Sequence, residues 1–396
     1  MISHQSATDR GASCFFGLSA ALLGLSYCVI SMADPDLGWH LAGGEFISRT
    51  GSVPRADFIN AIQDRWHDYH WLFQLGLFKI YTALGYVGIA VIFGLFSSIS
   101  FLLGYRVLRS ALSPSLSFLF FVLLFLLAQP VWVQRPQTYA LVGIALAQYI
   151  LETRWRFELV TTFLLAIVVS NFHVSWIFIP LLWFGYRVLP RFARKEAFSS
   201  MYAWGGCFLL GSAALWSPYG IFGQSNFPDL LLNYAILWDY LFLQPSVKSK
   251  VAEMATPFAL GGYIGPMLLV FLILIARFVD LRSLKDQPGS FFFFIVSLLL
   301  ALSSAKYLGL LAVAGLWFLP QYLLRWPVLK KLGEEKALVA ATTLIALALS
   351  TYLIWKMIER VPNEKRLTRE LEEAFPIREC REIGARMAKG EEARIL

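Results

Sequence analysis

Two carboxylates and an imidazole stand close together just after the first apolar stretch of the chain. Asp34, Asp36 and His40 lie in the run ADPDLGWHLAGGE, which covers residues 33–45. A carboxylate at a membrane surface can act as a general base toward an acceptor hydroxyl or amide, or help to bind a divalent cation. Because ionisable groups at membrane depth are costly, they are candidates for function by default.

The same run carries a helix start. An Asp-Pro pair is typical of a helix that has Asp34 as its N-cap and Pro35 in its first helical position. Asp36 then lies in the first turn, and His40 lies one turn later on the same face. Capping alone explains Asp34 but does not require a second carboxylate and an imidazole. We therefore expect Asp36 to have a function beyond capping, as a general base or as a cation ligand, with Asp34 as the second candidate.

A second ionisable stretch, WHDYHW, covers residues 66–71. Its tryptophans are typical of an interfacial belt. His67 and His70 are three residues apart and could hold a metal on a helix, but no ligand motif such as HExxH accompanies them. His70 is the better site candidate because it borders the apolar segment that follows.

Isolated polar residues occupy three short connections between apolar segments. Arg135, with Gln137 after it, either snorkels to the surface or grips a phosphate through its guanidinium. Lys306 has the same two interpretations. His173 is either a polar cap or a substrate contact.

The composition indicates what must position these residues. The chain has 396 residues, of which 58% are hydrophobic and 15% charged, whereas a soluble domain has about 25% charged residues. It is therefore an integral membrane protein. The net charge of +8 comes from Lys and Arg in short loops, without stacking aromatics between them, so a nucleic-acid partner is excluded. Its four cysteines have no CxxC spacing and indicate neither a zinc site nor a disulfide framework.

Hydropathy predicts about eleven spanning helices. They cover 13–32, 84–105, 114–133, 137–152, 158–172, 174–189, 200–217, 261–278, 289–305, 308–325 and 337–356. A semi-apolar piece at 69–82 is predicted to lie in the interface as an amphipathic helix. Residues 1–356 then form a transmembrane domain with long outer loops at 33–71 and 218–260, and residues 357–396 form a charged outer tail.

Basic residues predict the orientation. With a cytoplasmic N-terminus, every strongly basic short loop falls on the cytoplasmic side, as the positive-inside rule requires. A set of polar and ionisable residues from separate loops gathers on the outer face. They are Asp34, Asp36, His40, Glu45, Asp64, His67, Asp68, His70, Arg135, Gln137, His173, Glu253 and Lys306.

An ordered set of motifs in residues 13–325 resembles the GT-C fold glycosyltransferases of bacteria. The similar proteins are uncharacterised relatives of the dolichyl-phosphate-mannose-protein mannosyltransferase and arabinosyltransferase group. The motifs are DPDLGWHLAGGEFI at 34–47, GSVPRADF at 51–58, HWL at 70–72, RPQ at 135–137, NFH at 171–173 and SPYG at 217–220.

This resemblance implies an all-α polytopic membrane protein with a GT-C-like bundle of about 11 transmembrane helices and a helical first periplasmic loop. It implies an enzyme of the inner membrane that transfers a sugar from a polyprenyl-phosphate-linked donor to a glycan, lipid or protein acceptor on the periplasmic face. An acidic residue of the first outer loop is the family's catalytic base, which falls here on Asp36 or Asp34. The expected substrate-binding residues are His40, Glu45, His70, Arg135, Gln137, His173, Tyr219 and Lys306.

The chain departs from this family at two points. Relatives often carry Arg where this chain has Lys306, and they often continue into a soluble outer domain whose beginning resembles Phe375-Pro376-Ile377. The tail is thus expected to be an interfacial helix or a truncated domain. Some members use a divalent cation such as Mg²⁺ or Mn²⁺ and others do not, and both cases stay open here.

Two other classes of protein compete with this interpretation. A lipid or small-solute transporter or flippase would carry internal repeats and ionisable residues near mid-membrane. No clear repeat is visible, and the ionisable residues fall at helix ends. A non-catalytic GT-C-like scaffold is the third possibility.

Overall fold

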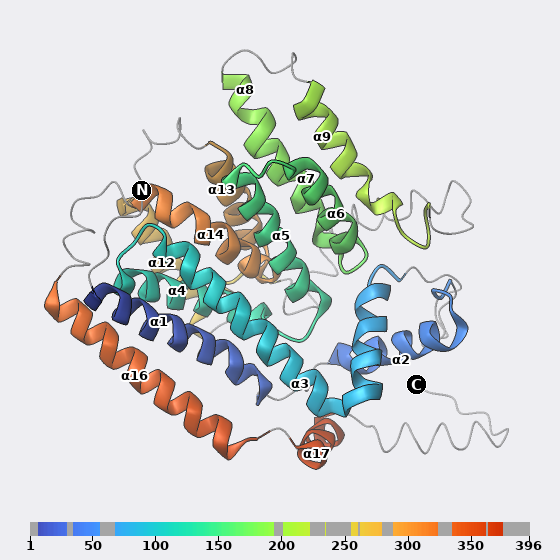
Figure 1. The fold of residues 1–396 in the computed structure, drawn as a ribbon, viewed down its shortest axis with the longest axis horizontal. Helices are drawn as coiled ribbons and strands as arrows, with labels where there is room; N and C mark the ends of the chain where they lie inside the picture. The colour runs from blue at the N-terminus through green and yellow to red at the C-terminus, as the bar shows by residue number, and fades with distance from the viewer. Residues whose placement is uncertain are drawn as a thin grey trace.

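The computed structural model describes most of the chain, and the described part is helical without a strand. The described residues are 7–29, 35–55, 68–193, 201–221, 234, 255–259, 262–278, 288–323, 335–361 and 363–374. The helices in Figure 1 are α1 (Ala7–Leu25), α2 (Pro35–Thr50), α3 (Trp71–Arg109), α4 (Pro114–Ala128), α5 (Pro136–Thr153), α6 (Glu158–Ser170), α7 (Phe178–Trp183), α8 (Leu189–Ala193), α9 (Met201–Gly211), α12 (Ile264–Phe278), α13 (Pro288–Ser303), α14 (Leu308–Leu323), α16 (Lys336–Glu359) and α17 (Glu364–Ala374). Single turns of other helix types are η1 (Ser26–Cys28), η2 (Gln129–Val131), η3 (Val174–Ile177), η4 (Phe184–Val188), η5 (Ser212–Leu215) and η8 (Ala305–Tyr307).

Proline sets the start of four of these helices. α2, α4, α5 and α13 begin at Pro35, Pro114, Pro136 and Pro288. Proline suits the first helical position because its missing N–H would have no partner there and its φ is already helical. The helix start that the sequence predicts at Pro35 is confirmed.

α3 consists of two straight parts that meet at a break. Gly85 has φ 64° and ψ −163°, a conformation that glycine tolerates and that interrupts the helix. The two N–H groups after the break are capped from the far end of the chain, since Tyr86 N and Val87 N donate to the Glu364 carboxylate of α17 at 3.3 and 3.2 Å. The sequence separates a piece at 69–82 from a span at 84–105, and the structure joins the two through this glycine.

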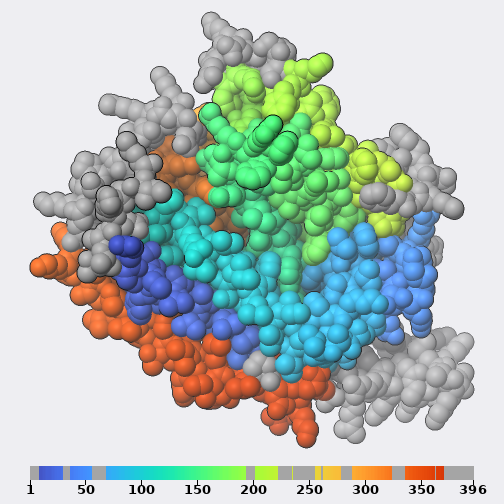
Figure 2. Space-filling view, viewed as in Figure 1, coloured from blue at the N-terminus to red at the C-terminus, as the bar shows by residue number. Residues whose placement is uncertain are grey.

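The two parts of α3 lie in different surroundings. The first part packs against α2, and the second runs along α1, which in turn contacts α16 (Figure 1). α17 lies against α3, as the red atoms at the lower edge of the space-filling view show (Figure 2). On the other side of the bundle, α5 contacts α6, α7 and α14, and α14 also packs on α4 and α13. The break in α3 therefore carries α2 away from the main bundle.

Close backbone approach holds α1 on α3. A Cβ built at Gly24 would lie 2.4 Å from Ser98 N and 2.5 Å from the carbonyl oxygen of Ser97, so only glycine fits at this crossing. Small residues at helix crossings are typical of membrane bundles. One large apolar cluster, which includes Phe16, Phe118 and Phe293, continues through most of the helices.

Four helical stretches are long and apolar enough to cross a membrane. The described residues therefore have the architecture of an all-α membrane protein. The four stretches are Asp9–Cys28, Trp71–Arg109, Pro114–Val131 and Lys336–Glu359. Shorter apolar helices include α6, α12 and α13. A helix occupies each of the eleven predicted ranges, but the number of spans stays a prediction. So does the division into a transmembrane domain and a tail, because most of 218–260 and all of 375–396 lie outside the described residues.

Candidate functional site

The first turn of α2 and the start of α5 are joined by an ion pair. Arg135 Nε lies 3.3 Å from Asp36 Oδ2, and the two side chains are 21% and 36% exposed. Asp36 stands in the first turn of α2, where the helix dipole favours a negative charge. Because both side chains remain accessible, either one can exchange its partner for a ligand. The structure thus brings together the predicted catalytic carboxylate and the predicted phosphate-binding guanidinium.

Three buried imidazoles form a row beside this pair. The histidine row consists of His40 on α2, His70 in the turn before α3 and His173 in the turn before η3. The ring centroids of His40 and His70 are 5.4 Å apart, as are those of His70 and His173, and the second pair is stacked. These residues come from three distant segments, so the convergence expected from the sequence is seen for all three.

The histidine row is uncharged at neutral pH. Burial is the main cause, and it lowers the pKa of His40 to about 3 with help from the nearby charge of Arg135. Burial and the Lys306 ammonium lower the pKa of His173 to about 3. Burial also holds the pKa of His70 well below its usual value. A neutral imidazole offers one donor and one acceptor, which suits hydroxyl groups better than it suits anions.

Hydrogen bonds orient His173 at the end of the row. Its Nδ1 accepts from Ser175 N at 3.1 Å and lies 2.7 Å from Ser175 Oγ. A neutral ring with Nδ1 as acceptor carries its proton on Nε2. The residue expected from sequence to be either a cap or a contact is therefore a cap through Nδ1, and its other nitrogen remains a donor.

A buried carboxyl group, that of Asp68, is hydrogen-bonded to the histidine row. It is 2% exposed, and its Oδ1 accepts from His70 N and from Gln74 Nε2, both at 3.1 Å. Among the described residues, Oδ2 has no hydrogen-bond partner. Burial raises the pKa of Asp68 to about 7, although the two hydrogen bonds oppose this shift. Gln74 Nε2 also lies 3.5 Å from His40 Nδ1, so one amide links the carboxyl group to the row.

The sequence places Asp68 on the outer face but gives it no role. The signal that could have found it is its position between two histidines and two tryptophans, immediately before the long apolar helix α3. A carboxyl group there is buried as soon as the flanking aromatic residues pack, and burial disfavours its charged form.

Tyr219 and Asn171 fasten the loops around the row. The Tyr219 hydroxyl donates to the Pro54 carbonyl at 2.7 Å and accepts from Asp68 N at 2.9 Å. Trp71 Nε1 donates to Asn171 Oδ1 at 2.7 Å, and Asn171 Nδ2 donates to the carbonyl oxygen of Trp216 at 2.9 Å. Tyr219, expected to bind substrate, thus links two distant loops through hydrogen bonds of its hydroxyl group.

Lys306 brings a cation to the same end of the bundle. It is buried in η8, between α13 and α14, and its Nζ lies 4.9 Å from the ring centroid of Tyr307. Gln137 Nε2 donates to the Lys306 carbonyl at 2.8 Å, which ties the start of α5 to this turn. The ammonium is close enough to His173 to lower its pKa, so Lys306 belongs to the site electrostatically.

Other sequence candidates are not joined to this cluster. Glu45 lies on the exposed side of α2, and within the described ranges no hydrogen bond or ion pair links it to the histidine row. Asp34, Asp64, His67 and Glu253 lie outside the described residues. No group of three or more His, Cys, Asp or Glu residues in the described part is arranged to hold a metal ion.

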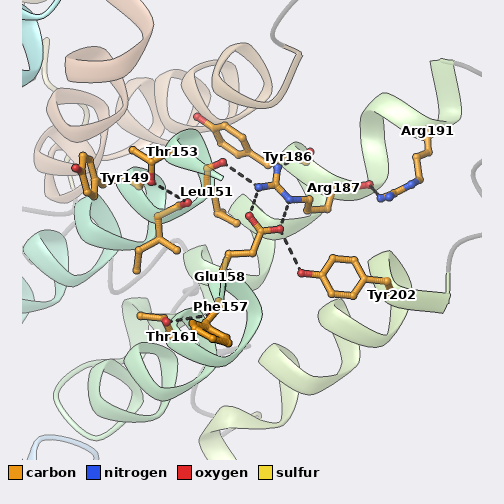
Figure 3. Close-up of polar contacts among 11 residues, drawn as sticks. Tyr149, Leu151, Thr153, Phe157, Glu158, Thr161, Tyr186, Arg187, Arg191 and Tyr202 are labelled. Carbon is orange, nitrogen blue, oxygen red and sulfur yellow. Dashed lines mark hydrogen bonds and ion pairs between the residues drawn. The ribbon is translucent and has the colours of Figure 1, made fainter. Parts of the chain in front are cut away.

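A second polar network stands at the opposite ends of α5 and α6 (Figure 3). Glu158 pairs with Arg187, accepts from the Tyr202 hydroxyl at 3.2 Å, and is buried. Arg187 also donates to the Leu151 carbonyl at 2.9 Å. Glu158 and Arg187 face each other as opposite charges, which is the pattern of a structural tie between helices. This network therefore lies at the end of α5 that is opposite to Arg135.

No family model, curated protein or solved structure matches this chain.

Proposed function

We propose that the chain is a membrane glycosyltransferase of GT-C type. It transfers a sugar from a polyprenyl-phosphate-linked donor to an acceptor on the periplasmic face of a bacterial inner membrane, with its N-terminus in the cytoplasm. The observation that carries this proposal is the pairing of Asp36 with Arg135, next to buried Lys306 and the neutral histidine row. A lipid-linked sugar phosphate needs this combination of anion-binding groups, hydroxyl-binding groups and one base beside apolar helices.

The proposed reaction is a direct displacement at the anomeric carbon. The Asp36 carboxylate accepts the proton of the acceptor hydroxyl, and the acceptor oxygen forms a bond to the anomeric carbon. The bond from that carbon to the phosphate oxygen breaks, and its electron pair leaves with the polyprenyl phosphate. Attack opposite the leaving group inverts the anomeric configuration. Asp34 is the alternative base.

Arg135 and Lys306 stabilise the departing phosphate. Preorganised cations aimed at developing negative charge are a large catalytic contribution in a site that excludes water. Arg135 can form two parallel hydrogen bonds to a phosphate, whereas Lys306 acts as a point charge. The histidine row would bind sugar hydroxyls through its neutral nitrogens.

Transfer and donor binding by the purified full chain test this proposal. The chain is reconstituted in vesicles with a panel of radiolabelled polyprenyl-phosphate sugars. We expect Asp36→Asn to lower transfer by about 100-fold or more with donor binding retained. Arg135→Gln should weaken donor binding by about tenfold, the value of a lost charge-assisted hydrogen bond.

A matched control exists at the other end of the bundle. Asp9 lies in the first turn of α1 and is 3.7 Å from Arg109 NH2, so Asp9→Asn removes a comparable helix-start carboxylate. Asp9→Asn should leave transfer unchanged. Transfer that survives in both Asp36→Asn and Asp34→Asn would rule out the proposed base. Movement of an unaltered donor across the vesicle membrane would indicate a transporter instead.

A further inference from the structure

An apolar groove opens on the side of the bundle and runs from a point near the candidate site to the opposite end of α3. This lateral groove lies between α3, α4, α5 and α14 and has a volume of about 500 Å³. Phe121, Leu124 and Leu141 lie along it, and the half-exposed side chains of Leu103 and Leu146 stand at its opening. All the helices that form it are apolar, so in a bilayer the opening faces hydrocarbon.

The two ends of the lateral groove differ in chemistry. One end reaches Trp132 and Gly309, near the turn that carries Lys306. The other end reaches Arg106 and Ser110, in the last turn of α3 and directly after it. Arg106 is exposed, whereas the neighbouring Arg109 already pairs with Asp9. A guanidinium at the end of an apolar groove complements an anionic headgroup on an acyl chain.

Length along the helices limits what fits. From Leu141 to Tyr149, both of which line the groove, α5 rises about 12 Å at 1.5 Å per residue. This length accommodates a stretch of one acyl chain. A phosphate at Arg106 is then at the end of α3 that basic residues place on the cytoplasmic side, where anionic lipids attract such residues.

We propose that the lateral groove binds one acyl chain of an anionic phospholipid whose phosphate is held by Arg106. This site is separate from the Asp36 and Arg135 pair, and it does not depend on the proposed transfer reaction. The occupant is a phospholipid of the leaflet next to Arg106. A polyprenyl chain that enters from the Trp132 end is the alternative that the test must reject.

Native mass spectrometry of the full chain in detergent, with dioleoyl phosphatidylglycerol and dioleoyl phosphatidylcholine in equal amounts, tests this proposal. We expect the wild type to prefer the anionic lipid about fivefold, which is the value of one basic residue near a membrane surface. Arg106→Gln should abolish that preference. Arg156→Gln removes an exposed arginine on the same predicted side, outside the groove, and should preserve it.

A second pair of variants tests the groove itself. Gly104 lines it, so the side chain of Gly104→Leu would occupy space meant for the acyl chain, and binding of both lipids should fall. Gly205→Leu adds the same side chain to an open helical position on α9 and should change nothing.

Several results would overturn the proposal. They are equal binding of the two lipids by the wild type, an unchanged preference in Arg106→Gln, full lipid binding in Gly104→Leu, or displacement of bound phosphatidylglycerol by undecaprenyl phosphate. If Gly104→Leu does not fold, Arg106→Gln decides alone, because it alters only an exposed side chain.

Discussion

Replacement of Asp68 by Asn should make the protein more stable at high pH and leave it little changed at low pH. In the unfolded chain the carboxyl group loses its proton near pH 3.8, whereas in the folded protein its pKa is about 7 because it is buried. Between these values the folded state binds more protons, so the free energy of unfolding of the wild type falls as the pH rises from about 4 to about 7. Asn cannot ionise and shows no such fall.

The expected size follows from the same two values. At about 1.4 kcal/mol per pH unit, a pKa raised from 3.8 to about 7 corresponds to about 4 kcal/mol, which is the upper bound on the gain above pH 8. Asn keeps the acceptor for His70 N and Gln74 Nε2, so the packing is nearly matched. His40 and His173 shift stability in the opposite direction. Their lowered pKa values give stability above about pH 6.5 that is lost as the pH falls, and this contribution is common to both proteins.

The measurement is thermal unfolding in detergent between pH 5 and 8.5, followed by intrinsic fluorescence for wild type and Asp68→Asn together. The quantity of interest is the difference between the two proteins, in which the histidine contribution cancels. That difference should grow from pH 5 to a little above pH 7 and then level off, because the carboxyl group is ionised in both states above its folded-state pKa. A difference that stays constant over this range, or a variant less stable than the wild type at pH 8, would refute the burial of an ionisable carboxyl group at this position.

Two further predictions concern how the site is held. Gly44→Ala should lower the free energy of unfolding by about 1–3 kcal/mol, because the new Cβ would lie 2.2 Å from the backbone oxygen of Gln74 and α2 would have to move off α3. Gly38→Ala on the same helix meets nothing within 4 Å, so a detergent denaturation midpoint that falls equally in both variants would contradict this close approach. Glu364→Ala should lower the free energy of unfolding by about 0.5–1 kcal/mol, because it removes the cap of the second part of α3. Lys365→Ala, at an exposed neighbouring position, should leave it unchanged. Equal denaturation midpoints for the two variants would show that the cap does not stabilise the protein.

The sequence predicts local features of the site well. The start of α2 at Pro35 follows from the Asp-Pro pair, and the spacing of Asp36 and His40 puts both beside Arg135. These features depend on helix periodicity and on the chemistry of the first turn, both of which a single segment contains. The apolar ranges likewise predict where helices occur, because each one is a property of about 20 consecutive residues.

Contacts between distant segments could not be predicted in the same way. The stacking of His70 on His173 and the burial of Asp68 depend on how the loops before α3 and η3 pack together. The residues of either loop alone do not predict this packing. The break in α3 is a similar case. A glycine at position 85 allows the break, but its cap is Glu364, which comes from the tail.

The tail therefore contributes to the site from a distance. Leu367 of α17 is 1% exposed and belongs to one apolar cluster with Leu37 and Phe73. Leu37 directly follows Asp36, and Phe73 lies 5.0 Å from His40 between ring centroids. The same short helix caps α3 after its break, so it stabilises the direction in which the first part of α3 leaves the bundle. It also supplies part of the apolar surface against which α2 packs. The carboxylate of Asp36 is consequently positioned by the charged tail as well as by its own helix, which gives that tail a structural role in the site.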